Sequence, residues 1–202
     1  MSLRQRPDER RQHLLEATAR CLASKGVAGI SVRAICAEAG VSPGLLGHYF
    51  GGVSDAIAEC YRWTGSSVVD ALDKAVAAAG ADPRARLLAY LTASFRPPIA
   101  SPQLLATWVA FWSLTQSDPA IAAVHAETYG EFRQGIERLI LAAYPGIGDA
   151  RLPAVALTAL IDGLWLELSL GQAPFSAQDA EDLVERWLGA LLGQPFPPGP
   201  RI

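Results

Sequence analysis

Apolar residues recur at intervals of three and four along almost the whole chain, which is the spacing of one buried face on an α-helix. No segment alternates apolar and polar residues as a half-buried strand does. Proline and glycine separate the periodic segments, because neither residue continues a helix well. The pattern predicts an all-α fold of about nine helices. Two are short and lie within 31–50, and the others are expected at 7–25, 54–79, 84–96, 101–117, 118–144, 150–171 and 176–192.

The two short helices are predicted from their end residues. Ser31 is a typical N-cap, and Gly40 supplies the left-handed residue with which a helix commonly ends. Ser42 then caps a second helix, with Pro43 at its first position. The apolar face of the first helix consists of Val32, Ile35, Cys36 and Ala39. A tight glycine turn between two short helices is typical of a DNA-binding helix-turn-helix, although an ordinary helical hairpin fits the same pattern.

A three-part organisation follows from these elements. Residues 1–53 are expected to form a small helix-turn-helix head, and residues 54–192 a larger helical body. Residues 193–202 contain too much proline and glycine for regular structure. The helix that opens the body is expected to bury Ile57, Cys60, Tyr61, Thr64, Val68, Leu72 and Val76.

The distribution of charge fits such a division. Residues 1–50 carry seven basic and four acidic side chains, whereas the remainder carries ten basic and sixteen acidic ones. A basic head on an acidic body suits a protein whose head approaches the phosphates of DNA.

Hydropathy and cysteine usage indicate the cellular compartment of the protein. The most apolar segment, 154–170, contains Asp162 and Glu167, so we expect no membrane span. No apolar signal core follows the arginine-rich N-terminus, and we expect a cytoplasmic protein. Three isolated cysteines on apolar faces predict buried thiols rather than disulfides or a metal site; they are Cys21, Cys36 and Cys60.

Three segments resemble a known family. AGVSPGLLGHYF, at 39–50, resembles the helix-turn-helix of the TetR family of one-component repressors. In the body, LATWVAFWSLTQSDP (105–119) and ALIDGLWLELSL (159–170) resemble the C-terminal domain of the choline-responsive, BetI-like repressors of the betaine pathway. The resemblance implies a homodimer that leaves a palindromic double-stranded DNA operator when each body binds a small molecule. It implies no cofactor and no metal.

The resemblance also implies which residues contact DNA. It places the exposed side of the second short helix against bases or backbone, and His48 and Tyr49 against phosphates. Hydroxyl and guanidinium groups at the helix beginnings add backbone contacts, and unpaired N–H groups at the start of the second helix suit a phosphate. The expected DNA-binding residues are Ser31, Arg33, Ser42, Pro43, Gly44, Leu45, Gly47, His48 and Tyr49.

Two positions depart from the family pattern. Gly47 stands where the family often has Tyr or Ser, and Val53 stands where it often has a backbone-binding lysine. The second helix contains no Arg or Lys that could read guanine. Recognition of the operator must therefore depend more on three other contacts: Leu45 with thymine methyl groups, backbone N–H groups, and Arg33. We expect a modest salt dependence, equivalent to about three or four neutralised phosphates per head.

Aromatic residues in the body suggest an effector site. Trp108, Phe111 and Trp112 share one helical face. With them, Tyr129, Asp162 and Trp165 would line a pocket for an apolar or cationic effector, such as a quaternary ammonium held over indole faces. The alternative is that these rings only pack the core.

The last two helices are expected to form the dimer surface. Their apolar stripes are too long for complete burial within one chain, unless both face its own core. The stripes consist of Leu160, Leu164, Leu168, Leu183, Trp187, Leu191 and Leu192.

The alternatives to a DNA-binding regulator are an enzyme and a binding module. An enzyme is not expected, because the three histidines, His13, His48 and His125, are scattered and no catalytic motif is present. The stronger alternative is a helical small-molecule-binding or protein-interaction module whose head no longer binds DNA.

Overall fold

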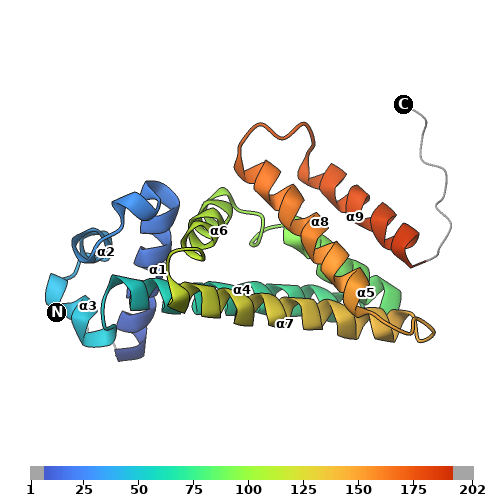
Figure 1. Cartoon of the computed structure of the whole chain (residues 1–202), viewed down its shortest axis with the longest axis horizontal. Coiled ribbons are helices and arrows are strands. Elements are labelled where there is room, and N and C mark those ends of the chain that lie inside the picture. Colours follow the sequence, from blue (N-terminus) through green and yellow to red (C-terminus); the bar gives the residue numbers. More distant parts are fainter. Residues whose placement is uncertain (1–6, 193–202) are drawn as a thin grey trace. The chain divides into compact units, whose positions relative to one another are not determined.

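The computed structural model describes residues 7–192, and within that range it contains helices and no strand (Figure 1). This confirms the all-α prediction. The irregular tail expected at 193–202 lies outside the described residues. The α-helices are α1 Pro7–Lys25, α2 Val32–Glu38, α3 Pro43–Tyr49, α4 Val53–Ala78, α5 Pro83–Thr92, α6 Pro102–Leu114, α7 Pro119–Ala143, α8 Arg151–Ser169 and α9 Ala177–Leu191.

Local capping explains most of the helix boundaries. The Ser31 hydroxyl accepts a hydrogen bond from the Ala34 N–H at 3.1 Å, and this bond starts α2. Gly40 ends the same segment with a φ of 64°, as expected. Ser176 begins α9 with a complete capping box in which Asp179 is the reciprocal partner.

Two details differ from the expected elements. The helix expected at 84–96 ends at Thr92 and continues as a 3-10 turn, Ala93–Phe95, before the Pro97-Pro98 pair. A second 3-10 turn, Val27–Gly29, lies between α1 and α2. Such short turns leave no hydrophobic period in the sequence, and the pattern therefore does not reveal them.

The chain folds into two compact units. The first contains residues 7–67 and 102–128, so that α1, α2, α3 and α6 lie in it together with the beginnings of α4 and α7. Within this unit α6 packs against α1, and the buried Thr107 hydroxyl donates to the Ala19 carbonyl at 3.3 Å. The division into a head ending at residue 53 and a separate body stays a prediction.

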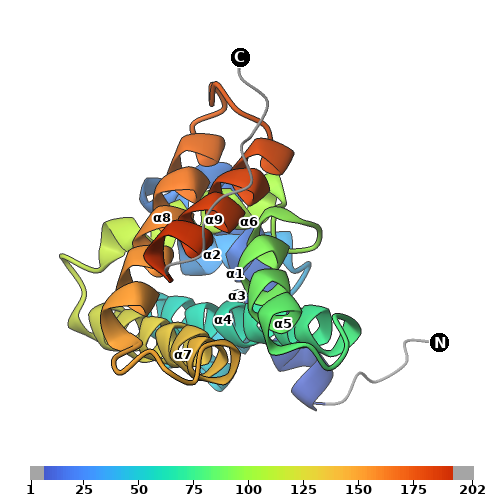
Figure 2. The same cartoon turned by 90° about the vertical axis from the view of Figure 1, so that its right-hand side faces the viewer.

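The second unit contains residues 68–101 and 129–192. Both views show α8 and α9 side by side within it, and α5 packs against α9 (Figures 1 and 2). Arg96 and the buried Glu181 form an ion pair with two hydrogen bonds, one of them 2.8 Å from Nε to Oε1. The Trp165 indole N–H donates to the Ser94 carbonyl at 2.8 Å and fixes α8 against the 3-10 turn Ala93–Phe95.

The predicted core residues are largely buried. On α4, six of the seven residues expected inside are buried, and Val68 is half-buried. The three cysteines are buried free thiols, as expected. Burial raises the pKa of the Cys60 thiol to about 12, so this thiol remains protonated and behaves as a small apolar group.

Candidate DNA-reading head and effector site

The outer side of α3 is formed by small or polar residues. Ser42, Pro43, Gly44, Gly47 and His48 are exposed. The buried Leu46 anchors the opposite side, and Leu45 and Tyr49 are half-buried beside it. Of the expected contact residues on α3, Pro43, Gly44, Gly47 and His48 are therefore accessible, whereas Leu45 and Tyr49 offer only part of their side chains.

The two serines at the helix beginnings behave differently. Ser31 caps α2, so its oxygen is occupied while its hydroxyl proton remains able to donate. Ser42 makes no side-chain capping bond, which differs from the expected cap. Pro43 has no N–H, and the Leu45 N–H donates instead to the Ser42 carbonyl at 3.0 Å. The exposed Ser42 hydroxyl is thus left for an outside partner.

Basic side chains of the head divide into paired and accessible ones. Arg11 is paired with Glu59 at 2.6 Å, and Arg20 with Glu38 at 2.7 Å. Arg33 is exposed on the first turn of α2 and takes part in none of the ion pairs found within residues 7–192. Arg33 is therefore the arginine of the short helices best placed to approach phosphates.

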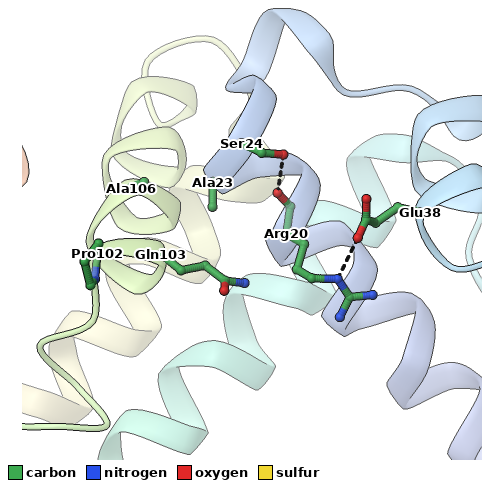
Figure 3. A pocket seen from close by; sticks show the side chains of 7 residues that line it. All are labelled: Arg20, Ala23, Ser24, Glu38, Pro102, Gln103 and Ala106. Atoms are coloured by element: carbon green, nitrogen blue, oxygen red, sulfur yellow. Dashed lines mark hydrogen bonds and ion pairs between the residues drawn. The ribbon is translucent and has the colours of Figure 1, made fainter.

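An open cavity of about 500 Å³ lies between the start of α6 and helices α1 and α2 within the first unit (Figure 3). Arg20 and Glu38 form one side of it, and Gln103 from the first turn of α6 forms the other. The Ser24 hydroxyl donates to the Arg20 carbonyl at 2.7 Å in the same wall. Because α6 contacts the head beside this cavity, a shift of α6 would be transmitted to α1.

The aromatic residues expected on α6 lie around Tyr61 of α4. The Tyr61 and Phe111 rings stack with centroids 4.2 Å apart, and Trp108 meets Tyr61 edge-on at 5.0 Å. Tyr61 Oη and His125 Nδ1 form a hydrogen bond of 2.8 Å. Trp108 and Phe111 are buried in this cluster, whereas Trp112 is half-buried. Their role as effector ligands stays a prediction.

In the second unit the structure brings Tyr129 and Asp162 together. The Tyr129 hydroxyl donates to Asp162 Oδ1 at 3.0 Å. Arg133 Nε donates to the Tyr129 carbonyl at 3.2 Å, and its guanidinium lies 5.9 Å from the centroid of the tyrosine ring. Burial raises the pKa of the Asp162 carboxyl to about 6, against the smaller opposing effects of the tyrosine hydrogen bond and the Arg133 charge.

Helices α8 and α9 present large apolar side chains to solvent. On α9, Leu183, Trp187 and Leu191 are exposed, as expected. On α8 the expected stripe is only half-exposed, and a neighbouring face is accessible instead. Its large side chains are Leu152, Val155, Leu166 and Leu170.

Comparison with known proteins agrees with this architecture. The family model described as bacterial regulatory proteins of the tetR family matches residues 14–53, and that of the BetI-type transcriptional repressor C-terminal domain matches residues 83–193. A curated relative, the HTH-type transcriptional regulator BetI of Burkholderia cenocepacia, is 31% identical over 183 residues, which cover 91% of this chain and 94% of the relative. The chain belongs to the TetR family.

Solved structures of other TetR-like regulators share the fold. A transcriptional regulator from Pseudomonas aeruginosa PAO1 is 41% identical, with a TM-score of 0.85 over 94% of this chain and 93% of that one. A regulator from Saccharomonospora viridis, solved in complex with choline, is 25% identical, with a TM-score of 0.76 over 90% and 96% of the two chains. This TetR-family protein is thus a ligand-responsive, DNA-binding transcriptional repressor, as the sequence predicted.

Some residues of this TetR-family protein were not singled out from the sequence. Arg133 lies one helical turn after Tyr129, so its proximity was predictable from the spacing alone. The contact between Tyr61 and His125 joins residues 64 positions apart, and no local signal indicates it. The choice of exposed face on α8 likewise has no local signal, because both faces are apolar.

Proposed function

We propose that this TetR-family repressor binds a palindromic operator as a cytoplasmic homodimer. We propose further that it leaves the operator when a cationic small molecule binds next to Asp162. The half-buried carboxylate of Asp162 is the observation on which the effector proposal depends.

The surroundings of the Asp162 carboxylate are suited to binding a cation. Tyr129 orients the carboxylate through one hydrogen bond, and among the described residues no basic side chain forms an ion pair with it. A desolvated carboxylate with a raised pKa gains most from an incoming positive charge, because little water competes for it. The choline complex of the Saccharomonospora viridis relative supports this class of effector.

The head supports operator binding through groups of two kinds. Arg33 and the hydroxyls of Ser31 and Ser42 are placed to contact phosphates and fix the register on the duplex. The outward side of α3 supplies the contacts to the grooves, and His48 and Tyr49 near its end add contacts to phosphates. Of the five basic side chains described in the head, Arg11 and Arg20 are paired within the protein, which favours the modest salt dependence expected above.

The exposed apolar faces of α8 and α9 support a homodimer. Trp187 is 52% exposed and Leu170 is 71% exposed. Exposure of such large apolar side chains to water is unfavourable and commonly marks an interface. Among the described residues, only α8 is long and apolar enough to cross a membrane by length and composition, and 33% of that window is buried. A second copy of the chain would cover the exposed part of α8 in a four-helix interface.

Calorimetric titration with choline tests the effector proposal. Asp162→Asn keeps the size of the side chain and an acceptor for the Tyr129 hydroxyl but removes the charge. We expect this variant to bind choline at least about tenfold more weakly, a loss of about 1.4 kcal/mol, because a quaternary ammonium has no N–H and is attracted by the charge of the carboxylate. Glu167→Gln removes an exposed charge from the same helix and should leave the affinity unchanged.

The outcomes separate the alternatives. Equal choline affinity in Asp162→Asn and the wild type contradicts the role of Asp162. Choline binding without release of operator DNA in a fluorescence anisotropy assay contradicts the coupling. Failure of the wild type to enrich any sequence from a random duplex pool favours a ligand-binding module whose head has lost DNA affinity.

A further inference from the structure

We propose that Gly44 and Gly47 determine operator specificity by leaving the DNA-facing side of α3 bare, so that the helix backbone lies directly against the floor of the major groove. The inference rests on the proposed role of α3 as the DNA-reading helix. It concerns how that helix reads bases without any Arg or Lys side chain.

The exposed residues of α3 lie on one side of the helix. At about 100° per residue, Pro43, Gly44, Gly47 and His48 fall within an arc of roughly 140°. All four are exposed. The half-buried and buried residues of the helix fall outside this arc and point toward the rest of the head. The two glycines therefore occupy the middle of the surface that faces outward.

Neither glycine is needed by the fold. Both lie inside a helix, and neither has the positive φ that favours glycine. A Cβ atom built at either position meets nothing within 4 Å. Glycine is the least favourable helix residue after proline, so alanine would make this short helix more stable at both sites. The head thus carries two unfavourable residues on one surface without any internal reason.

Two other helical glycines have internal reasons. A Cβ at Gly65 would lie 2.7 Å from Thr128 Cγ2, and one at Gly135 would lie 2.5 Å from Tyr90 Oη. Gly130 and Gly163 have open space, as Gly44 and Gly47 do, and Gly163 lies on the exposed face of α8 where a second copy is proposed to pack. An open helical glycine permits an outside surface to come close to the backbone, and α3 is distinguished by having two on one exposed surface.

The chemistry of α3 indicates what the close approach achieves. The bare surface carries a pyrrolidine ring at Pro43, two glycine Cα atoms and an imidazole at His48. The first three are apolar and match the C5-methyl group of thymine, which projects into the major groove. We therefore expect operator half-sites with thymines opposite Pro43 and Gly44. A methyl group added at position 44 or 47 would hold the helix away from them.

The test uses an operator chosen by the protein itself. The full-length wild type selects duplexes from a random-sequence pool, and fluorescence anisotropy then measures binding of the enriched duplex and of a scrambled duplex. The variants are Gly44→Ala and Gly47→Ala. Gly130→Ala is the matched control, because it also lies in a helix with open space at Cβ but far along the chain from the head.

The expected result is a more stable protein that binds its operator less well. Each head variant should lose about tenfold in affinity for the enriched duplex, the effect of one mismatched base pair, and change less than about twofold on the scrambled duplex. Its melting temperature should rise by about 2–4 °C. Gly130→Ala should melt higher as well and bind both duplexes as the wild type does. Replacing thymine by uracil in the half-site should weaken the wild type by a similar factor.

Each other outcome overturns a stated claim. If the wild type enriches no sequence, the proposed DNA binding fails and the inference fails with it. If a sequence is enriched but both alanine variants bind it within about twofold of the wild type, the inference alone is wrong. Equal losses on the enriched and scrambled duplexes, or an equal loss in Gly130→Ala, also overturn it, because they do not arise from contact with the groove floor.

Discussion

Replacing Asp162 by asparagine should stabilise the protein at neutral pH while weakening its response to the effector. In the folded protein the pKa of this carboxyl is raised from 3.8 to about 6, mainly by burial. Between pH 4 and 6 the folded state therefore binds more protons than the unfolded chain, and wild-type stability falls as the pH rises through this window. One pKa unit corresponds to about 1.4 kcal/mol, so the ionised carboxylate costs at most about 3 kcal/mol above pH 6.

Partial exposure of Asp162 to water reduces this cost, and we expect about 1–2 kcal/mol. Asp162→Asn should thus raise the melting temperature by about 2–8 °C at pH 7.5 for a protein of this size, and by almost nothing at pH 4. Thermal unfolding followed by circular dichroism at both pH values measures the difference, with Glu167→Gln as the control. A stabilisation of equal size at both pH values, or none at pH 7.5, would refute the assignment of a raised carboxyl pKa.

Three further predictions concern the dimer, the packing and the head. Trp187→Glu, with Glu185→Gln as control, should raise the dimer dissociation constant at least about 30-fold in sedimentation experiments; an unchanged constant places the interface elsewhere. Gly135→Ala, whose Cβ would lie 2.5 Å from Tyr90 Oη, should cost about 1–3 kcal/mol in urea unfolding, and no loss contradicts the packing. Arg33→Ala should lower the salt dependence of operator binding by about one phosphate, and an unchanged slope removes Arg33 from the interface.

The sequence by itself determined the helices and the order in which they occur. Their boundaries are encoded locally, by Ser31 and Ser176 as caps and by glycines such as Gly40 that accept a left-handed conformation. The helix-turn-helix was recognisable for the same reason, since its turn and both of its helix beginnings fall within twenty residues. Ser42 was the exception, because its carbonyl rather than its hydroxyl accepts the hydrogen bond of the Leu45 N–H.

Contacts between residues that are far apart in the sequence depend on tertiary packing and could not be predicted from local patterns. Tyr129 reaches Asp162 and Tyr61 reaches His125 across 33 and 64 positions of the chain. Hydrophobic periodicity predicts that a helix has an apolar face, but it does not predict which other element packs against that face. On α8, where apolar residues surround the helix, packing alone chose between the expected stripe and the one that is exposed. Burial, in turn, raised the pKa of Asp162, because desolvation depends on what the fold places around a carboxylate and not on the residues beside it in sequence.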